Sequence, residues 1–257
     1  MYRETLARLH QRHRTTKYPK VPPTLPDRFR GLPILSQAQC PEGCSSCVDI
    51  CPTQAIAFSN GKPSIDLGRC LFCTHCTDAC PEGHISLSNQ HSLAVRSRAE
   101  LVYDGSLAPK VEQLNSEMLR IFGRSLKLRQ VSAGGCNGCE VDINVLSTIV
   151  FDLGRFGIQF VASPRHADGI LVTGPVTENM KLALLKTYEA VPSPKLVIAS
   201  GACAISGGPF RDHPEVLNGV DTLIPVDLYI PGCPPHPLTT LDALLQLLGR
   251  MEKGKSS

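Results

Sequence analysis

The sequence has 257 residues, which is enough for one large domain or two small ones with their own hydrophobic cores. Hydrophobic residues make up 42% and charged residues 19%, as in soluble globular proteins, and no apolar run is long enough to span a bilayer. The formal charge of +3 does not by itself indicate nucleic-acid binding. The 12 cysteines are many for a cytoplasmic protein, and their clustering matters more than their number.

Residues 1–39 form the first expected unit, a basic and proline-rich docking arm. Residues 1–20 are charged throughout and lack the apolar core of a signal peptide, so we expect a cytoplasmic protein. An extended proline-rich piece follows at 19–26. We expect the arm to dock on a partner or on an anionic membrane surface, and the alternative is a solvated, disordered tail. A weak apolar stripe at helical spacing runs through its first residues: Tyr2, Leu6, Leu9 and His13.

Residues 40–95 contain eight cysteines in two runs of four, and a proline follows each run. The first run is Cys40, Cys44, Cys47 and Cys51, and the second is Cys70, Cys73, Cys76 and Cys80. In runs of this kind the first three thiolates wrap one 4Fe-4S cluster, and the fourth reaches the other cluster. We therefore expect cluster 1 on Cys40, Cys44, Cys47 and Cys80. Cluster 2 is expected on Cys70, Cys73, Cys76 and Cys51.

Zinc is the main alternative for these cysteines, because C-x2-C pairs also suit tetrahedral zinc. Two fourfold runs, each closed by proline, favour iron. His75 and His84 lie next to the runs and are expected to be surface or hydrogen-bonding residues, since no cysteine ligand is missing. The segment resembles the bacterial two-cluster ferredoxins, which implies an α+β ferredoxin domain. One extra residue at 42–43 departs from the ferredoxin pattern but leaves the ligand set intact.

Residues 96–125 are expected to be a connector, in which the run 111–124 has the apolar spacing of a packing helix. Residues 126–251 then alternate between strand-like and helical runs, and a flexible tail is expected at 252–257. The alternation predicts an α/β domain with a doubly wound, flavodoxin-like parallel sheet. Thr177 is a plausible N-cap for the second helix. Strands are expected at 126–131, 158–162, 170–173, 196–199 and 223–230, and helices at 141–153, 178–188 and 238–248.

The four remaining cysteines each follow an expected strand. Cys136 and Cys139 come after the first strand, Cys203 after the fourth, and Cys233 after the fifth. Ligands of parallel sheets sit beyond the carboxyl ends of the strands, so these four thiols can meet and hold a third 4Fe-4S cluster, cluster 3. Isolated core cysteines and a thioredoxin-like C-x2-C pair are the alternatives. Each four-thiolate cubane adds a charge of roughly −2, so three of them would change the formal charge of +3 to about −3.

Residues 126–251 resemble the small subunit shared by energy-converting (group 4) NiFe-hydrogenases, formate hydrogenlyase and respiratory complex I, where it is the 20 kDa subunit. The pair Cys136-x2-Cys139 followed by Glu140 favours the hydrogenase side, because complex I proteins typically have adjacent cysteines here. The residues HPL at 236–238, which follow the loop of Cys233, favour the hydrogenase side too, because complex I proteins usually have RPE there. The resemblance rests on GCNGCE at 135–140, SPRHAD at 163–168, TGPVT at 173–177, GAC at 201–203 and PVDLYIPGCPP at 225–235.

The first domain resembles the two-cluster ferredoxin subunit of the same complexes, through YP at 18–19, FRG at 29–31 and LAV at 93–95 as well as the cysteines. The chain therefore looks like a fusion of two subunits that are usually separate. The resemblance implies a non-catalytic electron-transfer subunit of a hydrogenase-type oxidoreductase complex, peripheral on the inner face of the cell membrane. Its implied partners are a NiFe-type large subunit and membrane-arm subunits, with a formate dehydrogenase or a ferredoxin as electron donor.

Two other functions stay open. The same relay could serve a complex I-like enzyme without NiFe, or the chain could be a stand-alone ferredoxin-like carrier. No catalytic residue is expected in this chain, since three clusters use all 12 cysteines and leave none for a NiFe site. Glu140, Arg165 and His166 are candidates for tuning cluster potentials, with an ordinary structural role as the alternative. Sheet geometry puts Arg165 and His166 at the amino end of the strand at 170–173, away from the cysteines.

Overall fold

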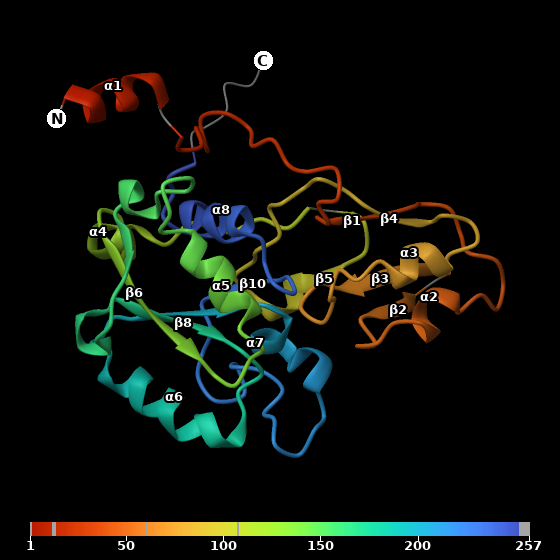
Figure 1. Ribbon diagram of the computed structural model, residues 1–257. Coiled ribbons are helices and arrows are strands. Elements are labelled where there is room, and N and C mark those ends of the chain that lie inside the picture. Colours follow the sequence, from red (N-terminus) through yellow and green to blue (C-terminus); the bar gives the residue numbers. More distant parts are fainter. Residues whose placement is uncertain (1, 12–13, 60, 107, 252–257) are drawn as a thin grey trace.

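The computed structural model describes residues 2–11, 14–59, 61–106 and 108–251 (Figure 1). His13 of the expected apolar stripe and the expected tail at 252–257 lie outside these residues. The chain forms an N-terminal part with small antiparallel sheets and a C-terminal part built on one parallel sheet. Helix α1 (Tyr2–Gln11) projects from the body of the molecule in Figure 1 and buries none of its residues.

The N-terminal part has two sheets. Strand β1 (Pro33–Leu35) pairs with β4 (Ile85–Leu87), and β3 (Lys62–Asp66) pairs with both β2 (Ile56–Ser59) and β5 (Val102–Tyr103). These sheets extend beyond the range 40–95 at both ends, because β1 comes from the expected arm and β5 from the expected connector. The short helices of this part are α2 (Ser46–Asp49), α3 (His75–Ala79) and η1 (Arg98–Leu101).

The C-terminal part is a five-stranded, fully parallel sheet in the order β10-β9-β8-β6-β7, which is the flavodoxin-like order. Every residue of β8 and β9 is buried, as expected for apolar strands covered on both faces. The expectation of an α/β parallel-sheet domain is therefore confirmed. The strands are β6 (Leu126–Ser132), β7 (Ile158–Phe160), β8 (Gly169–Thr173), β9 (Leu196–Ser200) and β10 (Leu228–Ile230).

The two faces of this sheet have different covers. One face packs against α4 (Ser116–Phe122), α5 (Gly138–Val145) and α8 (Pro237–Leu247), whose apolar residues share one hydrophobic cluster with the sheet. The other face packs against α6 (Glu178–Ala190) and α7 (Ala202–Ser206), and its cluster continues into the N-terminal part. Short helical turns complete the fold: η2 (Leu153–Phe156), η3 (Pro164–His166) and η4 (Gly208–Phe210). No helix in the described part of the chain combines the length and apolarity that crossing a bilayer needs.

Several elements are shorter than their sequence patterns predicted, for local reasons. Helix α5 ends at Val145, after which the amides of residues 146–148 bond to carbonyls three residues back in tight turns instead of continuing the α-helical pattern. Helix α4 begins only after Asn115, whose side chain accepts from the Met118 amide at 2.9 Å. Thr177 does occupy the N-cap position of α6, but its side chain makes no capping hydrogen bond.

Strand β10 covers only the last three residues of the expected run 223–230. Pro225 lies within that run and offers no amide to a sheet. Asp227, just before the strand, donates its amide to the Val197 carbonyl at 2.8 Å and accepts from the Val197 amide at 2.8 Å through its carboxylate. The chain therefore enters the edge of the sheet through one backbone and one side-chain contact with Val197.

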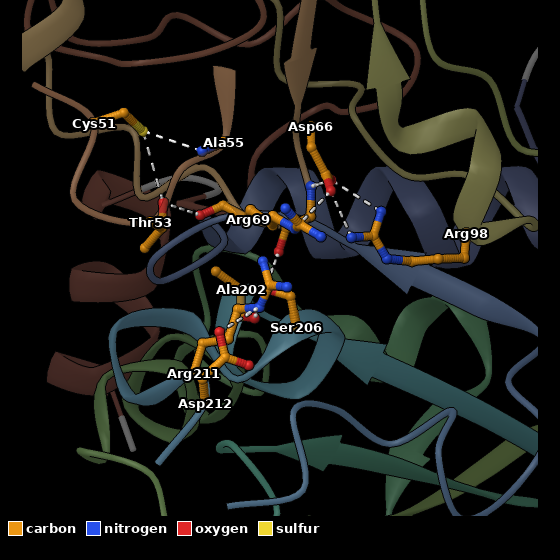
Figure 2. Close-up of polar contacts among 11 residues, drawn as sticks. Cys51, Thr53, Ala55, Asp66, Arg69, Arg98, Ala202, Ser206, Arg211 and Asp212 are labelled. Carbon is orange, nitrogen blue, oxygen red and sulfur yellow. Dashed lines mark hydrogen bonds and ion pairs between the residues drawn. The ribbon is translucent and has the colours of Figure 1, made fainter. Parts of the chain in front are cut away.

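The two parts are joined by backbone and side-chain contacts. Val95, in the segment after the last N-terminal cysteine, forms an antiparallel bridge with Tyr229 on edge strand β10. In Figure 2, Ser206 of α7 donates to the Gly68 carbonyl at 2.9 Å. A side chain at Gly68 would come within 2.7 Å of Ile205, so the N-terminal backbone lies directly on α7. Arg98 binds Asp66 through two hydrogen bonds, of 2.9 and 2.7 Å, beside this contact (Figure 2).

Candidate metal centres

All 12 cysteines are free thiols, and they gather in three groups. In group 1, burial raises the pKa of Cys40, and negative charge on Cys44 and Cys80 raises it further. Burial also raises the pKa of Cys47 to about 11, with added contributions from Cys80 and Cys40. These mutual effects mean that Cys40, Cys44, Cys47 and Cys80 lie close together.

Group 2 consists of Cys70, Cys73, Cys76 and Cys51. Burial raises the pKa of Cys70 to about 12, and the charges of the other three thiols add to the shift. Backbone amides point at some sulfur atoms. The Phe72 amide donates to Cys70 Sγ at 3.3 Å. The Ala55 amide donates to Cys51 Sγ at 3.2 Å, as Figure 2 shows. Amide donors of this kind stabilise thiolate sulfur and set cluster potentials.

Group 3 brings together four thiols from three loops. Burial raises the pKa of Cys139, followed by negative charge on Cys203, Glu140, Cys233 and Cys136. Burial similarly raises the pKa of Cys203 to about 12. The loops follow β6, β9 and β10, so the thiols meet beyond the carboxyl ends of the strands.

Glycines let the backbone approach two thiols of group 3 closely. A β-carbon on Gly201 would lie 2.6 Å from Cys139 Sγ, and one on Gly208 would lie 2.8 Å from Cys203 Sγ. Both glycines also have positive φ angles of 93° and 56°, which side chains disfavour. Four soft thiolates with glycine backbone close to them fit an iron–sulfur cluster.

Among the described residues, no set of three or more His, Cys, Asp or Glu side chains is placed to hold a single metal ion. The donor set of each group and the glycines of group 3 fit clusters rather than a single ion. Burial and the negative charge of neighbouring thiolates raise the pKa values of these cysteines, so cations are needed to hold them as thiolates. Binding of such cations releases the thiol protons.

Group 2 lies next to both of the other groups. Cys47 of group 1 feels the charge of Cys76 in group 2, and Cys233 of group 3 feels the charge of Cys73 in group 2. Helices α2 and α3, which carry thiols of groups 1 and 2, lie side by side in Figure 1. Helices α5 and α7, which carry thiols of group 3, lie in the C-terminal part. Group 2 is thus the middle group.

Glu140 lies beside group 3, in the first turn of α5, and is only 7% exposed. Burial alone would raise its pKa, but hydrogen bonds from the Ser132 and Thr173 side chains together lower it. Thr173 Oγ1 donates to Glu140 Oε1 at 2.5 Å. A buried negative charge is therefore held next to Cys139 and Cys203.

Arg165 and His166 lie in η3, before the amino end of β8. The cysteines of group 3 follow the opposite, carboxyl ends of the strands. A tuning role for these two residues stays a prediction, and this placement does not favour it.

Two residues next to the candidate centres had no chemical role assigned from the sequence. Arg30 Nη1 donates to the Phe72 carbonyl at 3.0 Å, within the loop of group 2. The ring of Phe29 meets His236 edge-on, with 5.3 Å between the ring centroids, next to the loop of group 3. The motif FRG at 29–31 was the available signal, but spacing alone does not tell which loops it contacts.

A second buried network was also not foreseen. Tyr18 donates to the buried carboxylate of Asp242, and His91 Nε2 lies 3.4 Å from the Tyr18 hydroxyl. Gln246 donates to the other oxygen of Asp242 at 2.6 Å. This network fastens the arm to α8, and single polar residues scattered over the chain give no periodic signal for it.

Two protein families match this chain. The family described as "NADH ubiquinone oxidoreductase, 20 Kd subunit" matches residues 136–247, and the "4Fe-4S dicluster domain" matches residues 39–84. The two matches cover the residues of all three thiol groups.

Several curated proteins are similar. Formate hydrogenlyase subunit 7 of Escherichia coli is 44% identical over 143 residues, and the chain spans 56% of its length. The probable membrane-bound hydrogenase subunit mbhJ of Pyrococcus furiosus is 41% identical over 149 residues, which is 57% of this chain and 89% of that protein. A subunit of the NADH-quinone oxidoreductase of Bacteroides thetaiotaomicron is 40% identical over 160 residues, which is 58% of this chain and 80% of that protein.

Proposed function

Because the chain belongs to the family of the NADH ubiquinone oxidoreductase 20 kDa subunit, we propose that it relays electrons between a donor and the active site of a membrane-bound hydrogenase or formate hydrogenlyase-like complex. The observation that carries this proposal is the position of group 2 next to both other thiol groups, through Cys47 with Cys76 and Cys73 with Cys233. Carriers that lie next to one another suit electron transfer through a protein.

The proposal assigns three 4Fe-4S clusters. Group 1 holds cluster 1, group 2 holds cluster 2 and group 3 holds cluster 3, with four thiolates each. When bound, the clusters supply one-electron transfer. The residues of the chain hold the clusters, exclude water from them and direct amide donors and buried charge at them.

The terminal chemistry belongs to a partner, a NiFe-type large subunit that covers cluster 3. Cys136 and Cys233 are exposed, and Val141 of α5 is 51% exposed beside them. Exposed thiols and an exposed apolar side chain suit a surface that a partner covers. The C-x2-C pair at 136–139 and the similarity to hydrogenlyase and hydrogenase subunits favour the NiFe-type partner.

The arm supplies a second contact, with the inner face of the cell membrane and the membrane-arm subunits. On α1, Tyr2, Leu6 and Leu9 are 78%, 47% and 70% exposed. Arg3 and Arg8 lie on the same helix. A basic helix with exposed apolar residues suits an anionic bilayer surface, although one short helix binds it weakly without a second anchor.

A complex I-like enzyme without NiFe is the second candidate, favoured by the 40% identity to a subunit of an NADH-quinone oxidoreductase. Purification of the native complex from detergent-solubilised membranes separates the two. The proposal expects a co-purified large subunit that contains nickel, and hydrogen formation with a reduced dye as donor. A large subunit without nickel would favour the second candidate, and recovery of the chain alone would favour a stand-alone carrier.

The electron donor is proposed to be a formate dehydrogenase or a ferredoxin that reaches cluster 1, the cluster farthest from the large subunit. In the purified complex, Cys44→Ser should abolish reduction by the donor protein. Reduction of cluster 3 by a small dithionite-like reductant should persist. The opposite result would place the donor at another cluster.

A further inference from the structure

A hollow of about 340 Å³ lies between the loop of group 2 and the loop of group 3. Phe72 lines it from one side, and Cys233 and His236 line it from the other. Phe29 and Arg30 of the arm line it too. Cys233, which feels the charge of Cys73 in group 2, therefore lies at a hollow that the arm helps to line.

Phe29 and Arg30 contact one loop each. Arg30 Nη1 donates to the Phe72 carbonyl at 3.0 Å. The Phe29 ring stands edge-on to the His236 ring, at 5.3 Å between centroids and 89° between planes. Because the two residues are neighbours in sequence, their backbone ties the two loops together. We call this pair the Phe29–Arg30 bridge.

The bridge is fixed on its carboxyl side by backbone contacts with the segment after β4. The Gly31 amide donates to the Ser88 carbonyl at 2.8 Å, and the Leu32 amide donates to the Gln90 carbonyl at 2.9 Å. A β-carbon on Gly31 would overlap the Gln90 carbonyl, so only glycine permits this approach.

The bridge is fixed on its amino side by Tyr18. The Tyr18 hydroxyl donates to buried Asp242, and the Tyr18 carbonyl accepts from Arg155 Nη2 at 2.9 Å. Both ends of the segment that carries Phe29 and Arg30 are therefore anchored, and the bridge has a defined position.

We propose that Phe29 and Arg30 are positioning residues for electron transfer between cluster 2 and cluster 3. Phe29 holds the loop of cluster 3 against the loop of cluster 2, and Arg30 also sets a positive charge at their junction. A positive charge there lowers the cost of adding an electron to either cluster. This inference rests on the proposed function, because it needs both clusters.

The test uses the purified complex with three charge variants and one packing variant. Arg30→Gln removes the charge but keeps a donor, and Arg30→Lys keeps the charge. Arg28→Gln is the matched control, because Arg28 lines the same hollow while no bond from it to the loop of group 2 is present among the described residues. Phe29→Leu removes the ring contact with His236. The readouts are iron per chain, redox titrations followed by electron paramagnetic resonance, and the magnetic coupling of reduced clusters 2 and 3.

We expect Arg30→Gln to keep its iron. The equilibrium constant for adding an electron to cluster 2 or 3 should fall by about threefold to tenfold, and no further, since solvent screens an exposed charge. Arg30→Lys should behave like the unmodified chain, and Arg28→Gln should shift the constant less, because Arg28 lacks the hydrogen bond that holds Arg30 at the Phe72 carbonyl. Phe29→Leu should weaken the magnetic coupling with little change in potential.

Unchanged potentials in Arg30→Gln, or equal shifts in Arg28→Gln, would overturn the role of Arg30. Coupling that survives in Phe29→Leu would overturn the role of Phe29. If Arg30→Gln loses iron, Arg30→Lys decides, because a shifted potential in that charge-preserving variant would contradict the charge effect. Failure of the proposed function looks different, since the unmodified chain would then lack one of the three clusters or a nickel-containing large subunit, whatever the variants do.

Discussion

The thiols of Cys73 and Cys233 lie within electrostatic reach of each other, although they belong to different parts of the chain. Cys73 sits in the loop before α3, and Cys233 follows β10 at the edge of the parallel sheet. Two contacts fix this relationship, the bridge between Val95 and Tyr229 and the bond from Ser206 to Gly68.

Serine in place of Cys233 should remove one cluster and spare the others. The hydroxyl is a poor ligand for iron, so the iron content should fall from about 12 to about eight per chain. Cys44→Ser should cause the same loss of iron but remove a different paramagnetic signal. Iron analysis and electron paramagnetic resonance of both variants check this, and loss of the same signal in both would contradict separate sites.

Glutamine in place of Glu140 should raise the potential of cluster 3. The carboxylate is buried and charged beside Cys139 and Cys203, and its removal lowers the repulsion that opposes an added electron. We expect the equilibrium constant for reduction of cluster 3 to rise on the order of tenfold, which corresponds to ~59 mV for one electron. Redox titration of the complex measures it.

The control for Glu140 is Glu189→Gln, a carboxylate on the exposed surface of α6. It should leave the potential of cluster 3 unchanged. In Thr173→Val the Glu140 carboxylate loses a hydrogen-bond donor that lowers its pKa, so it should take up a proton, and the potential of cluster 3 should rise, at a higher pH than in the unmodified chain. A potential that stays constant in Glu140→Gln would show that Glu140 has only a packing role.

Phenylalanine in place of Tyr18 should destabilise the protein. Asp242 is 2% exposed, and the change leaves its carboxylate with one donor fewer at a cost of about 1–3 kcal/mol. Thermal unfolding of the cluster-loaded protein should show a lower midpoint. Tyr2→Phe is the control, because Tyr2 is 78% exposed and its change should leave the midpoint in place.

Stability should fall as the solution becomes more acidic, in part through His91. Burial lowers the pKa of His91 in the folded protein, while the charge of Asp242 offsets part of the shift. The unfolded chain therefore takes up a proton first, and stability is lost as pH falls below about 6.5. Tyr18, Asp242 and His236 face this ring, and burial lowers the pKa of His236 too.

Anaerobic denaturation midpoints between pH 7.5 and 5.5 test this prediction. His91→Gln should flatten the profile without removing its slope, because His236 contributes in the same direction. His10→Gln on exposed α1 should leave the profile as it is. A profile that is equally steep in His91→Gln would show that other groups cause the acid sensitivity.

Vesicle binding should depend on the apolar residues of α1. Leu6→Asp and Leu9→Asp remove exposed apolar surface from a basic helix, so they should reduce co-sedimentation of the complex with anionic vesicles severalfold. Leu182→Asp is the control, because Leu182 is 65% exposed on α6, far along the chain from the arm. Equal binding by all three variants would contradict membrane docking by α1.

Much of the fold was predictable because its signals are local. Strands β8 and β9 are continuous apolar runs, and each precedes a glycine-bearing loop. The helix ends were less predictable, since α5 ends in a few tight-turn hydrogen bonds at 146–148 and α4 starts at a single hydrogen bond to Asn115. Such bonds depend on a few atoms, whereas a helical pattern sums many residues.

The thiol groups follow from spacing and from sheet topology, but the contacts between groups do not. The proximity of Cys73 to Cys233 depends on how the two parts pack, and no periodic pattern encodes that packing. The contact of Arg30 with the Phe72 carbonyl is of the same kind, because a backbone acceptor carries no sequence signal.

Iron content tests the central claim most directly. The purified chain, prepared without oxygen, should contain about 12 iron atoms and an equal amount of acid-labile sulfide, as three 4Fe-4S clusters require. Its reduced form should show three distinguishable paramagnetic signals. About eight iron atoms per chain would remove the cluster of Cys136, Cys139, Cys203 and Cys233, and zinc in place of iron would contradict the relay altogether.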